Sequence, residues 1–151
     1  MSSPVTHAWL CEQIVTGSSL AFIFADEKGI IRLWNAGAEA MFGYPASGAI
    51  GQSMDIIVPE KHRPKHWEGY DRVMATGVTK YGREPLAVPA TRKDGSRISI
   101  EFNIILLRSP EGKVLGSAAV IQDVTARWEK EKASRARLAA LEAKVAELEK
   151  Q

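Results

Sequence analysis

The fold that we expect for this chain of 151 residues follows mainly from the stretch Ile31-Arg32-Leu33-Trp34-Asn35-Ala36-Gly37-Ala38-Glu39-Ala40-Met41-Phe42-Gly43-Tyr44. Residues 31–34 are mostly apolar and predict a strand. Asn35 predicts the start of a short helix, because its side-chain oxygen can accept a hydrogen bond from a free amide of the first turn. Gly43 predicts the end of that helix, because glycine readily adopts the left-handed conformation that closes helices. A strand that leads directly into a small helix is typical of the wall of a pocket.

Two later motifs follow this stretch in order. Arg92-Lys93-Asp94-Gly95 stands between two apolar segments, and its Asp-Gly pair favours a hairpin turn with positive φ. Asp123-Val124-Thr125 follows the last apolar segment, where Asp123 or Thr125 can cap a terminal helix. Together the three motifs resemble a PAS sensory domain over about residues 18–128.

That resemblance implies an α+β PAS fold with a five-stranded antiparallel sheet and short helices on one face. The helix-like spacing of apolar residues over 8–15 predicts an N-terminal amphipathic helix, and the composition from Ala126, without glycine or proline, predicts a long C-terminal helix. We expect residues 1–17 to form the N-terminal helical cap, residues 18–125 the PAS domain and residues 126–151 a C-terminal coiled-coil helix. A longer helix within the domain is expected to start near Pro64 and to stop at Gly77. The predicted strands cover residues 20–25, 29–34, 86–91, 97–106 and 114–122.

The composition narrows the functional class. The net charge is +2, with 20 basic and 18 acidic residues interleaved, so the sequence has no basic patch for nucleic acid. No apolar run approaches the ~18 residues of a membrane span, and the N-terminus lacks the features of a signal peptide. Cys11 is the only cysteine, which fits a reducing compartment. We therefore expect a cytoplasmic protein that binds neither nucleic acid nor a membrane.

The sequence does not predict an enzyme. It contains no nucleophile elbow, no glycine-rich phosphate loop and no His-Glu-x-x-His zinc pair. Glu101 falls on the polar phase of its strand and Asp123 at a helix start, so a surface role and a capping role explain these carboxylates. Nothing around Cys11 resembles the cysteine motif of light-sensing PAS domains, and a flavin photoreceptor is therefore not expected.

The hollow between the sheet and its helices is the expected place for a small ligand. Residues 116–119 are Gly, Ser, Ala and Ala, which leave space where large side chains would fill it. A solid core without a ligand explains the same apolar pattern, and the sequence leaves both interpretations open. The apolar phases predict an inward wall of Phe22, Phe24, Ile56, Ile57, Val73, Met74, Leu86, Val88, Ile98, Ile100, Phe102, Ile104 and Val120. The predicted ligand-binding residues are Phe24, Ile57, His66, Tyr70, Met74, Leu86, Ile100, Phe102 and Val120.

His66 makes haem b a candidate for that ligand. The resemblance implies His66 as the metal-binding residue, since haem PAS domains of soluble chemoreceptors carry a histidine with a tyrosine four residues later, here Tyr70. The Tyr70 hydroxyl could then donate a hydrogen bond to a bound gas. The arrangement of oxygen-sensing kinases would need a histidine near Lys80, where the sequence has none. PAS domains without haem also carry a histidine at the position of His66, so another small ligand or no ligand stays open.

The C-terminal segment predicts a homodimer. Its apolar residues occupy heptad a and d positions and are expected to form a seam with a second chain. The seam consists of Leu138, Leu141, Val145 and Leu148. Two heptads make a weak coiled coil, so an outward Ile23, the helix that carries Trp9, and Trp128 are candidates to assist the pairing. A monomer with a free or folded-back tail is the alternative.

The expected function is a sensory module that binds a small ligand, with haem sensing a diatomic gas or redox state as one case. The signal is expected to pass through Asp123, Thr125 and Trp128 into the dimeric C-terminal helix, and from there to a kinase, cyclase or receptor. A ligand-free PAS adaptor for dimerisation and protein interaction is the alternative function.

Overall fold

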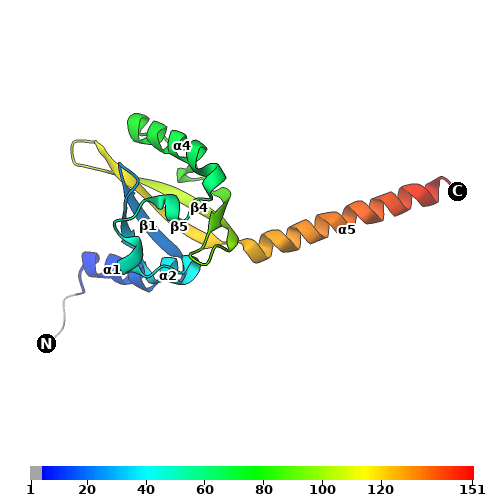
Figure 1. Cartoon of the computed structure of the whole chain (residues 1–151), viewed down its shortest axis with the longest axis horizontal. Coiled ribbons are helices and arrows are strands. Elements are labelled where there is room, and N and C mark those ends of the chain that lie inside the picture. Colours follow the sequence, from blue (N-terminus) through cyan, green and yellow to red (C-terminus); the bar gives the residue numbers. More distant parts are fainter. Residues whose placement is uncertain (1–4) are drawn as a thin grey trace.

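A five-stranded antiparallel sheet in the order β2-β1-β5-β4-β3 forms the centre of the computed structural model, which describes residues 5–151 (Figure 1). The strands are β1 (Ala21–Asp26), β2 (Ile31–Trp34), β3 (Leu86–Thr91), β4 (Arg97–Arg108) and β5 (Val114–Asp123). We call the face of the sheet that packs against the short helices the inner face, and the opposite face the outer face. The predicted α+β architecture is confirmed.

The helices follow the predicted order along the chain. They are α1 (His7–Gly17), α2 (Ala36–Phe42), α3 (Ala46–Ala49), α4 (Arg63–Thr76) and α5 (Thr125–Glu149). Short 3₁₀ turns lie at η1 (Met54–Ile56), η2 (Glu60–His62) and η3 (Lys80–Gly82). Residues 1–4 of the predicted N-terminal cap lie outside the described residues.

Asn35 and Gly43 delimit α2 as the sequence predicted. The side chain of Asn35 accepts a hydrogen bond from the Ala38 amide at 2.9 Å and so caps α2. Gly43 ends α2 in the left-handed conformation with φ of 82°. Phe42 and Ile31 are the largest completely buried side chains among the described residues, so this motif also supplies the centre of the core.

The predicted phase of β1 is wrong. Ile23, expected to point outward, is only 2% exposed and belongs to the core with Ala21. Phe22 and Phe24 therefore point to the outer face, because successive side chains of a strand alternate between its two faces. The segment is apolar at every position, so its pattern cannot identify the inner phase. Small alanines face inward here because α2 packs tightly against the start of β1.

Val120 is also on the outer face, contrary to its predicted place in the inward wall. It is the cross-strand partner of Phe22, whereas its neighbour Ile121 is the partner of Ala21 and is buried. Paired residues in a sheet share one face. The other apolar phase, through Ile100, Phe102 and the rest of β4, faces inward as predicted.

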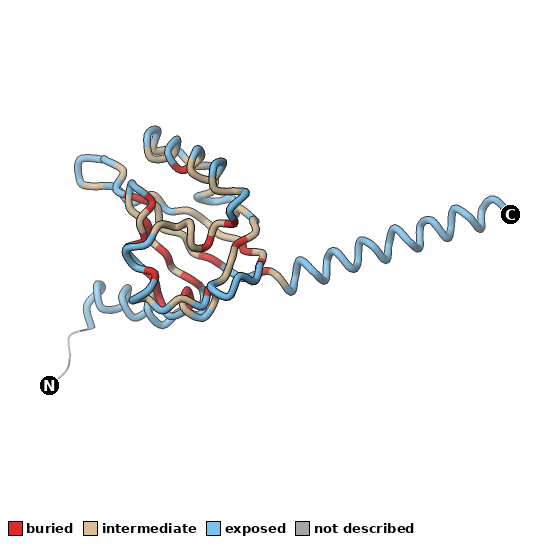
Figure 2. Tube along the Cα trace, viewed as in Figure 1, coloured by how far each residue is buried: buried red, intermediate tan, exposed pale blue. Residues whose placement is uncertain are grey.

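The long helix α5 leaves the domain at the end of β5 and lies apart from it (Figures 1 and 2). Residues 126–149 are all exposed. The helix contains neither glycine nor proline, which agrees with the prediction of a continuous helix from about Ala126. No described helix combines the length and the apolar character that a membrane span needs.

Candidate functional site

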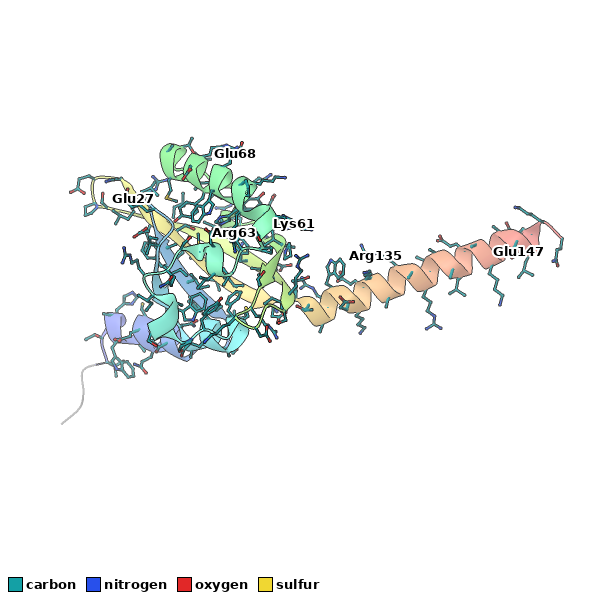
Figure 3. All side chains as sticks on the ribbon, in the orientation of Figure 1. Glu27, Lys61, Arg63, Glu68, Arg135 and Glu147 are labelled. Carbon is teal, nitrogen blue, oxygen red and sulfur yellow. The ribbon has the colours of Figure 1, made fainter. Side chains whose placement is uncertain are left out.

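The start of α4 is fixed to the preceding loop by its own side chains. Arg63, labelled in Figure 3, donates hydrogen bonds to the backbone carbonyls of Val58 at 3.1 Å and Asp55 at 3.2 Å. One turn later, the indole of Trp67 donates to a carboxylate oxygen of Asp55 at 2.7 Å. A Cβ at Gly29 would collide with the Trp67 ring, so this close contact between α4 and the β1–β2 turn requires glycine.

Tyr70 ties the middle of α4 to the end of β1. Its hydroxyl donates to the backbone carbonyl of Asp26, and the carbonyl of Ala25 lies 3.2 Å away. Burial, together with the nearby carboxylates of Asp26 and Asp71, raises the pKa of the Tyr70 phenol, so this group remains a donor. The hydroxyl predicted to serve a bound gas is therefore engaged by the backbone in this structure.

His66 lies one turn before Tyr70 on the same side of α4. Its ring stacks on that of Tyr70 with the ring centres 6.0 Å apart, and it meets Trp67 edge to face at 4.8 Å. The Nδ1 atom is buried and has no hydrogen-bond partner among the described residues. Burial lowers the pKa of His66, while the carboxylate of Asp55 opposes the shift, so the imidazole is neutral near pH 7.

A neutral imidazole with a free ring nitrogen is suited to bind a metal. The described residues contain no group of three or more His, Cys, Asp and Glu side chains that could hold a bare metal ion. A haem iron needs only one or two ligands from the protein, because the porphyrin supplies the other four. His66 is the residue of this region that could hold a haem iron.

The apolar inner face near α4 is incompletely covered by the chain itself. Ile57 and Ile100, two of the predicted binding residues, are buried in the core. Other apolar residues of α4, β3 and β4 keep intermediate exposure. These residues are Val73, Met74, Leu86, Val88, Phe102, Ile104 and Leu106. We call them the inner wall. Of the remaining predicted binding residues, Phe24 and Val120 are on the outer face and cannot join it.

The end of α4 is held by a residue that the sequence reasoning missed. Arg108, at the end of β4, donates to the carbonyl of Gly77 at 2.6 Å and to that of Gly112 at 3.3 Å. Gly77 is the C-cap of α4. Both ends of the helix are therefore attached to other elements, and α4 lies beside β5 (Figure 1).

Asn35 has a larger role than the predicted helix cap. Its carbonyl oxygen also accepts from the amide of Phe22 at 2.9 Å. Its amide nitrogen donates to the carbonyls of Val15 at 2.7 Å and Leu20 at 3.0 Å. One buried side chain therefore joins the end of α1, the start of β1 and, through Ala38, the start of α2. The cap signal located this residue, but the sequence could not show its distant partners.

The junction between β5 and α5 is a hydrogen-bonded cluster around Asp123. One carboxylate oxygen accepts from the amide of Thr125 at 2.9 Å and from its hydroxyl at 2.6 Å. The other oxygen meets Arg92 of the β3–β4 turn at 3.2 Å. The hydroxyl of Thr125 accepts from the amide of Ser99 at 2.9 Å, which joins α5 to β4.

Asp123, one of the two predicted capping residues, caps α5 from one residue before the N-cap position. The N-cap position of α5 is Val124, whose side chain cannot accept a hydrogen bond. Asp123, one residue earlier, satisfies the first helical amide instead. Trp128 lies on the exposed first turn of α5, and its amide bonds to the carbonyl of Val124 at 2.8 Å.

Partial burial tends to raise the pKa of Asp123, but the bonds from Thr125 and the charge of Arg92 outweigh it and hold the pKa below its usual range. A carboxylate with a lowered pKa contributes stability that is fully present above the pKa of the unfolded chain. That contribution is lost as the pH falls through the folded pKa. The junction is therefore intact near neutral pH and weakens only in acid.

We expect Asp123→Ala to loosen the junction locally. The change removes the acceptor for the first helical amide and the partner of Arg92, a loss of about 1 kcal/mol. Hydrogen exchange should become faster first over residues 124–128, while the strand over residues 98–106 stays protected. Glu111→Ala, in the exposed β4–β5 turn, serves as the control. Uniform loosening of the domain by Asp123→Ala would refute a local role.

The predicted dimer seam is fully available on α5. Its four side chains are each more than half exposed: Leu138, Leu141, Val145 and Leu148. No contact with the domain covers them in the part of the chain that the structure describes.

Comparison with known proteins gives the family. A family model described as "PAS fold" matches residues 15–129. An uncharacterised protein of Azorhizobium caulinodans is 34% identical over 108 residues, which is 71% of this chain and 14% of that protein. The sensor protein FixL of Bradyrhizobium diazoefficiens is 33% identical over 87 residues, or 56% of this chain and 17% of FixL. The oxygen sensor protein DosP of Escherichia coli is 29% identical over 98 residues, 65% of this chain and 12% of DosP.

Solved structures share the fold. The PAS domain of a Colwellia psychrerythraea protein superposes with a TM-score of 0.66 at 22% identity, covering 80% of this chain and 99% of that domain. An RNA-binding light-oxygen-voltage receptor gives a TM-score of 0.72 at 21% identity over 95% of this chain and 40% of the receptor. The chain spans less than a fifth of the length of the curated relatives that it matches.

Proposed function

This chain belongs to the PAS family, and we propose that it is a sensory module which binds a small ligand between α4 and the inner wall. The ligand state would set the position of α4, and the Asp123–Thr125 junction would carry the change into α5. The incompletely covered inner wall is the observation that carries this proposal, because apolar surface of this kind favours an apolar occupant.

Haem b is the ligand that the residues fit best. His66 would hold the iron, since its imidazole is neutral and one ring nitrogen lacks a partner. The inner wall would contact the apolar porphyrin and exclude water. When bound, haem supplies an iron centre that takes up diatomic gases. The likeness to an oxygen sensor protein supports this choice of ligand.

The relay has a direct covalent and hydrogen-bonded route. β5 lies beside both α4 and β4, and it continues into α5 through Asp123. The β3–β4 turn joins the same cluster through Arg92. A shift of α4 against β5 would therefore reach the first turn of α5 with few intermediates. The output partner would be a kinase, cyclase or receptor attached to, or bound by, this helix.

Native mass spectrometry and an absorbance scan of protein purified from haem-supplied cells test the proposed function. We expect a small molecule bound at one copy per domain. Ile104→Trp should fill the space beside the inner wall and displace it, while Val78→Trp, at an exposed loop position, should not. A bare polypeptide after expression with haem would contradict ligand binding.

The exposed seam supports a second proposed role of α5, the pairing of two chains. If Leu141 and Val145 meet their counterparts in a second chain, changing both to lysine buries charges in the interface. We expect the dimer dissociation constant to rise by ~100-fold, measured by sedimentation. Ala139→Lys with Ala143→Lys places the same charges outside the seam and should change little. Equal association of the two variants would show that α5 does not hold the dimer.

A ligand-free adaptor is the second candidate, and the exposed apolar seam of α5 favours it. An adaptor needs α5 as a pairing surface but no occupant beside the inner wall. The mass measurement separates the two functions, because a ligand-free adaptor purifies as bare polypeptide.

A further inference from the structure

Strand β4 is longer than its partner β3, and the difference leaves part of one edge of β4 free. The pairing of the two strands runs from Thr91 opposite Arg97 to Leu86 opposite Phe102, while β4 continues to Arg108. Beyond Phe102, no backbone hydrogen bond joins another described segment to this side of β4. We call this part of β4, residues 103–107, the free edge.

The backbone groups of Ile104 and Leu106 point toward the free edge. The carbonyl of Ser99 accepts from the Val124 amide at 2.9 Å, on the β5 side of β4. Backbone groups of successive residues point to opposite sides of a strand, so the odd-numbered residues of β4 face β5 and the even-numbered ones face β3. Ile104 and Leu106 therefore present amides and carbonyls that have no backbone partner among the described residues, and both belong to the inner wall.

Residues 78–85, which connect α4 to β3, run along the free edge with chain to spare. Arg108 holds Gly77 at one end, and the pairing of Leu86 with Phe102 fixes the other end. The chain makes nine residue steps between Gly77 and Leu86, whereas β4 covers the same stretch in six. At about 3.4 Å per step in a strand, the connection has roughly 10 Å in excess. The 3₁₀ turn η3 takes up this excess.

The connection is only loosely attached to β4. The side-chain amide of Asn103 donates one long hydrogen bond, to the Tyr81 carbonyl at 3.5 Å. Gly82 lies close to the strand, since a Cβ added there would be 3.8 Å from the Ile104 carbonyl oxygen. The segment is thus beside the free edge without forming strand hydrogen bonds to it.

We propose that residues 82–85 are a strap that closes onto the free edge as a continuation of β3. Extending the register of β3 with β4 places Glu84 opposite Ile104 and Gly82 opposite Leu106. The amide and carbonyl of both strap residues would then face the unpaired groups of β4. The strap is open in this structure and needs only the loss of the η3 turn to close.

The prolines of this region fit a paired strand. The Thr91 amide donates to the Ile57 carbonyl at 2.9 Å, so the odd-numbered residues of β3 face away from β4. Pro89 occupies such a position, and Pro85 would occupy another. A proline on that side removes no hydrogen bond from the ladder. Pro85 also favours an extended conformation at Glu84, the residue before it.

Two residues favour the open state. Gly82 loses more conformational freedom in a strand than any other residue type would. The carboxylate of Glu84 would turn toward the inner wall, because side chains of paired residues share a face, and a charge against apolar surface is unfavourable. Inward-pointing charges of this kind limit the pairing of edge strands. Closure would leave an occupant of the inner wall only the route past α4, a consequence that rests on the proposed function.

Amide exchange of the ligand-free full chain, followed by NMR, tests the strap. Gly82→Val with Glu84→Val, the closing pair, removes both obstacles, and a side chain at position 82 has room. We expect the amides of Ile104 and Leu106 to exchange ~10-fold more slowly than in the wild type. The amide of Ile105, which faces β5, should not change. Gly82→Val with Glu84→Pro is the matched control, because it lacks the amide that would bond to Ile104.

The strap is refuted if the closing pair exchanges like the wild type, or if the proline control is protected to the same extent. Transfer of haem from loaded protein to apomyoglobin then tests the consequence for an occupant. We expect the closing pair to slow this transfer by ~10-fold relative to the proline control, and equal rates would show that the strap does not retain the occupant. A wild-type protein that takes up no haem would refute haem binding, while the exchange measurement still decides whether the strap exists.

Discussion

Asn35→Asp is expected to lower the free energy of unfolding by about 3 kcal/mol at pH 7. The substitution keeps the size and shape of the side chain but replaces its amide donors by a carboxylate oxygen. That oxygen would face the backbone carbonyls of Val15 and Leu20, which now accept from Asn35. A buried negative charge against two carbonyl oxygens has no compensating donor there. The loss should appear in urea unfolding.

Asn103→Asp is the matched control for this prediction. Asn103 lies on the outer phase of β4 and makes one long hydrogen bond, to the Tyr81 carbonyl at 3.5 Å. We expect its replacement to cost less than about 1 kcal/mol. A loss below that value for Asn35→Asp would mean that the bonds of Asn35 to α1 and β1 contribute little to the fold.

His66→Ala is expected to abolish haem binding completely. Protein reconstituted with haem should show a strong band near ~400 nm, and removal of the only proposed iron ligand should eliminate it. His62→Ala provides the control, because His62 lies in the 3₁₀ turn before α4 and is not part of the aromatic contacts of His66. Wild-type protein that stays colourless after reconstitution would exclude haem and leave another small ligand or the adaptor function.

Tyr70→Phe now tests two different roles. The sequence predicted a hydroxyl that is free to donate to a bound gas. In the structure this hydroxyl donates to the Asp26 carbonyl at the end of β1. A change in stability without a change in gas affinity would assign Tyr70 to anchoring α4. An altered gas affinity would require that the hydroxyl leaves Asp26 when haem binds.

Local chemistry made most of the fold predictable. Asn35 marks the start of α2 and Gly43 its end. The alternating pattern of β4 identified the side chains that face inward, because those on the opposite side of the strand are mostly polar. The pattern of β1 failed because all of residues 20–25 are apolar. The inner side carries Ala21, Ile23 and Ala25, and α2 lies close to the start of β1, where a Cβ at Gly37 would collide with the Leu20 carbonyl.

The candidate site was only partly predictable for a related reason. His66 and the inner phase of β4 follow from a family pattern and from strand alternation. The bonds of Tyr70 to β1, of Arg108 to Gly77 and of Asn35 to α1 join residues far apart in the sequence. No periodicity marks such partners, which meet only in the folded chain.

Hydrogen exchange of haem-loaded and haem-free protein shows whether an occupant beside the inner wall controls α5. We predict that loading slows exchange in α4 and also changes it over residues 124–128, while the buried strand over residues 98–100 stays unchanged. Asp123→Ala should uncouple α4 from the junction, so that haem loading still protects α4 but no longer affects residues 124–128. Protection of α4 with identical exchange at the junction in loaded and haem-free wild-type protein would show that the occupant does not control α5.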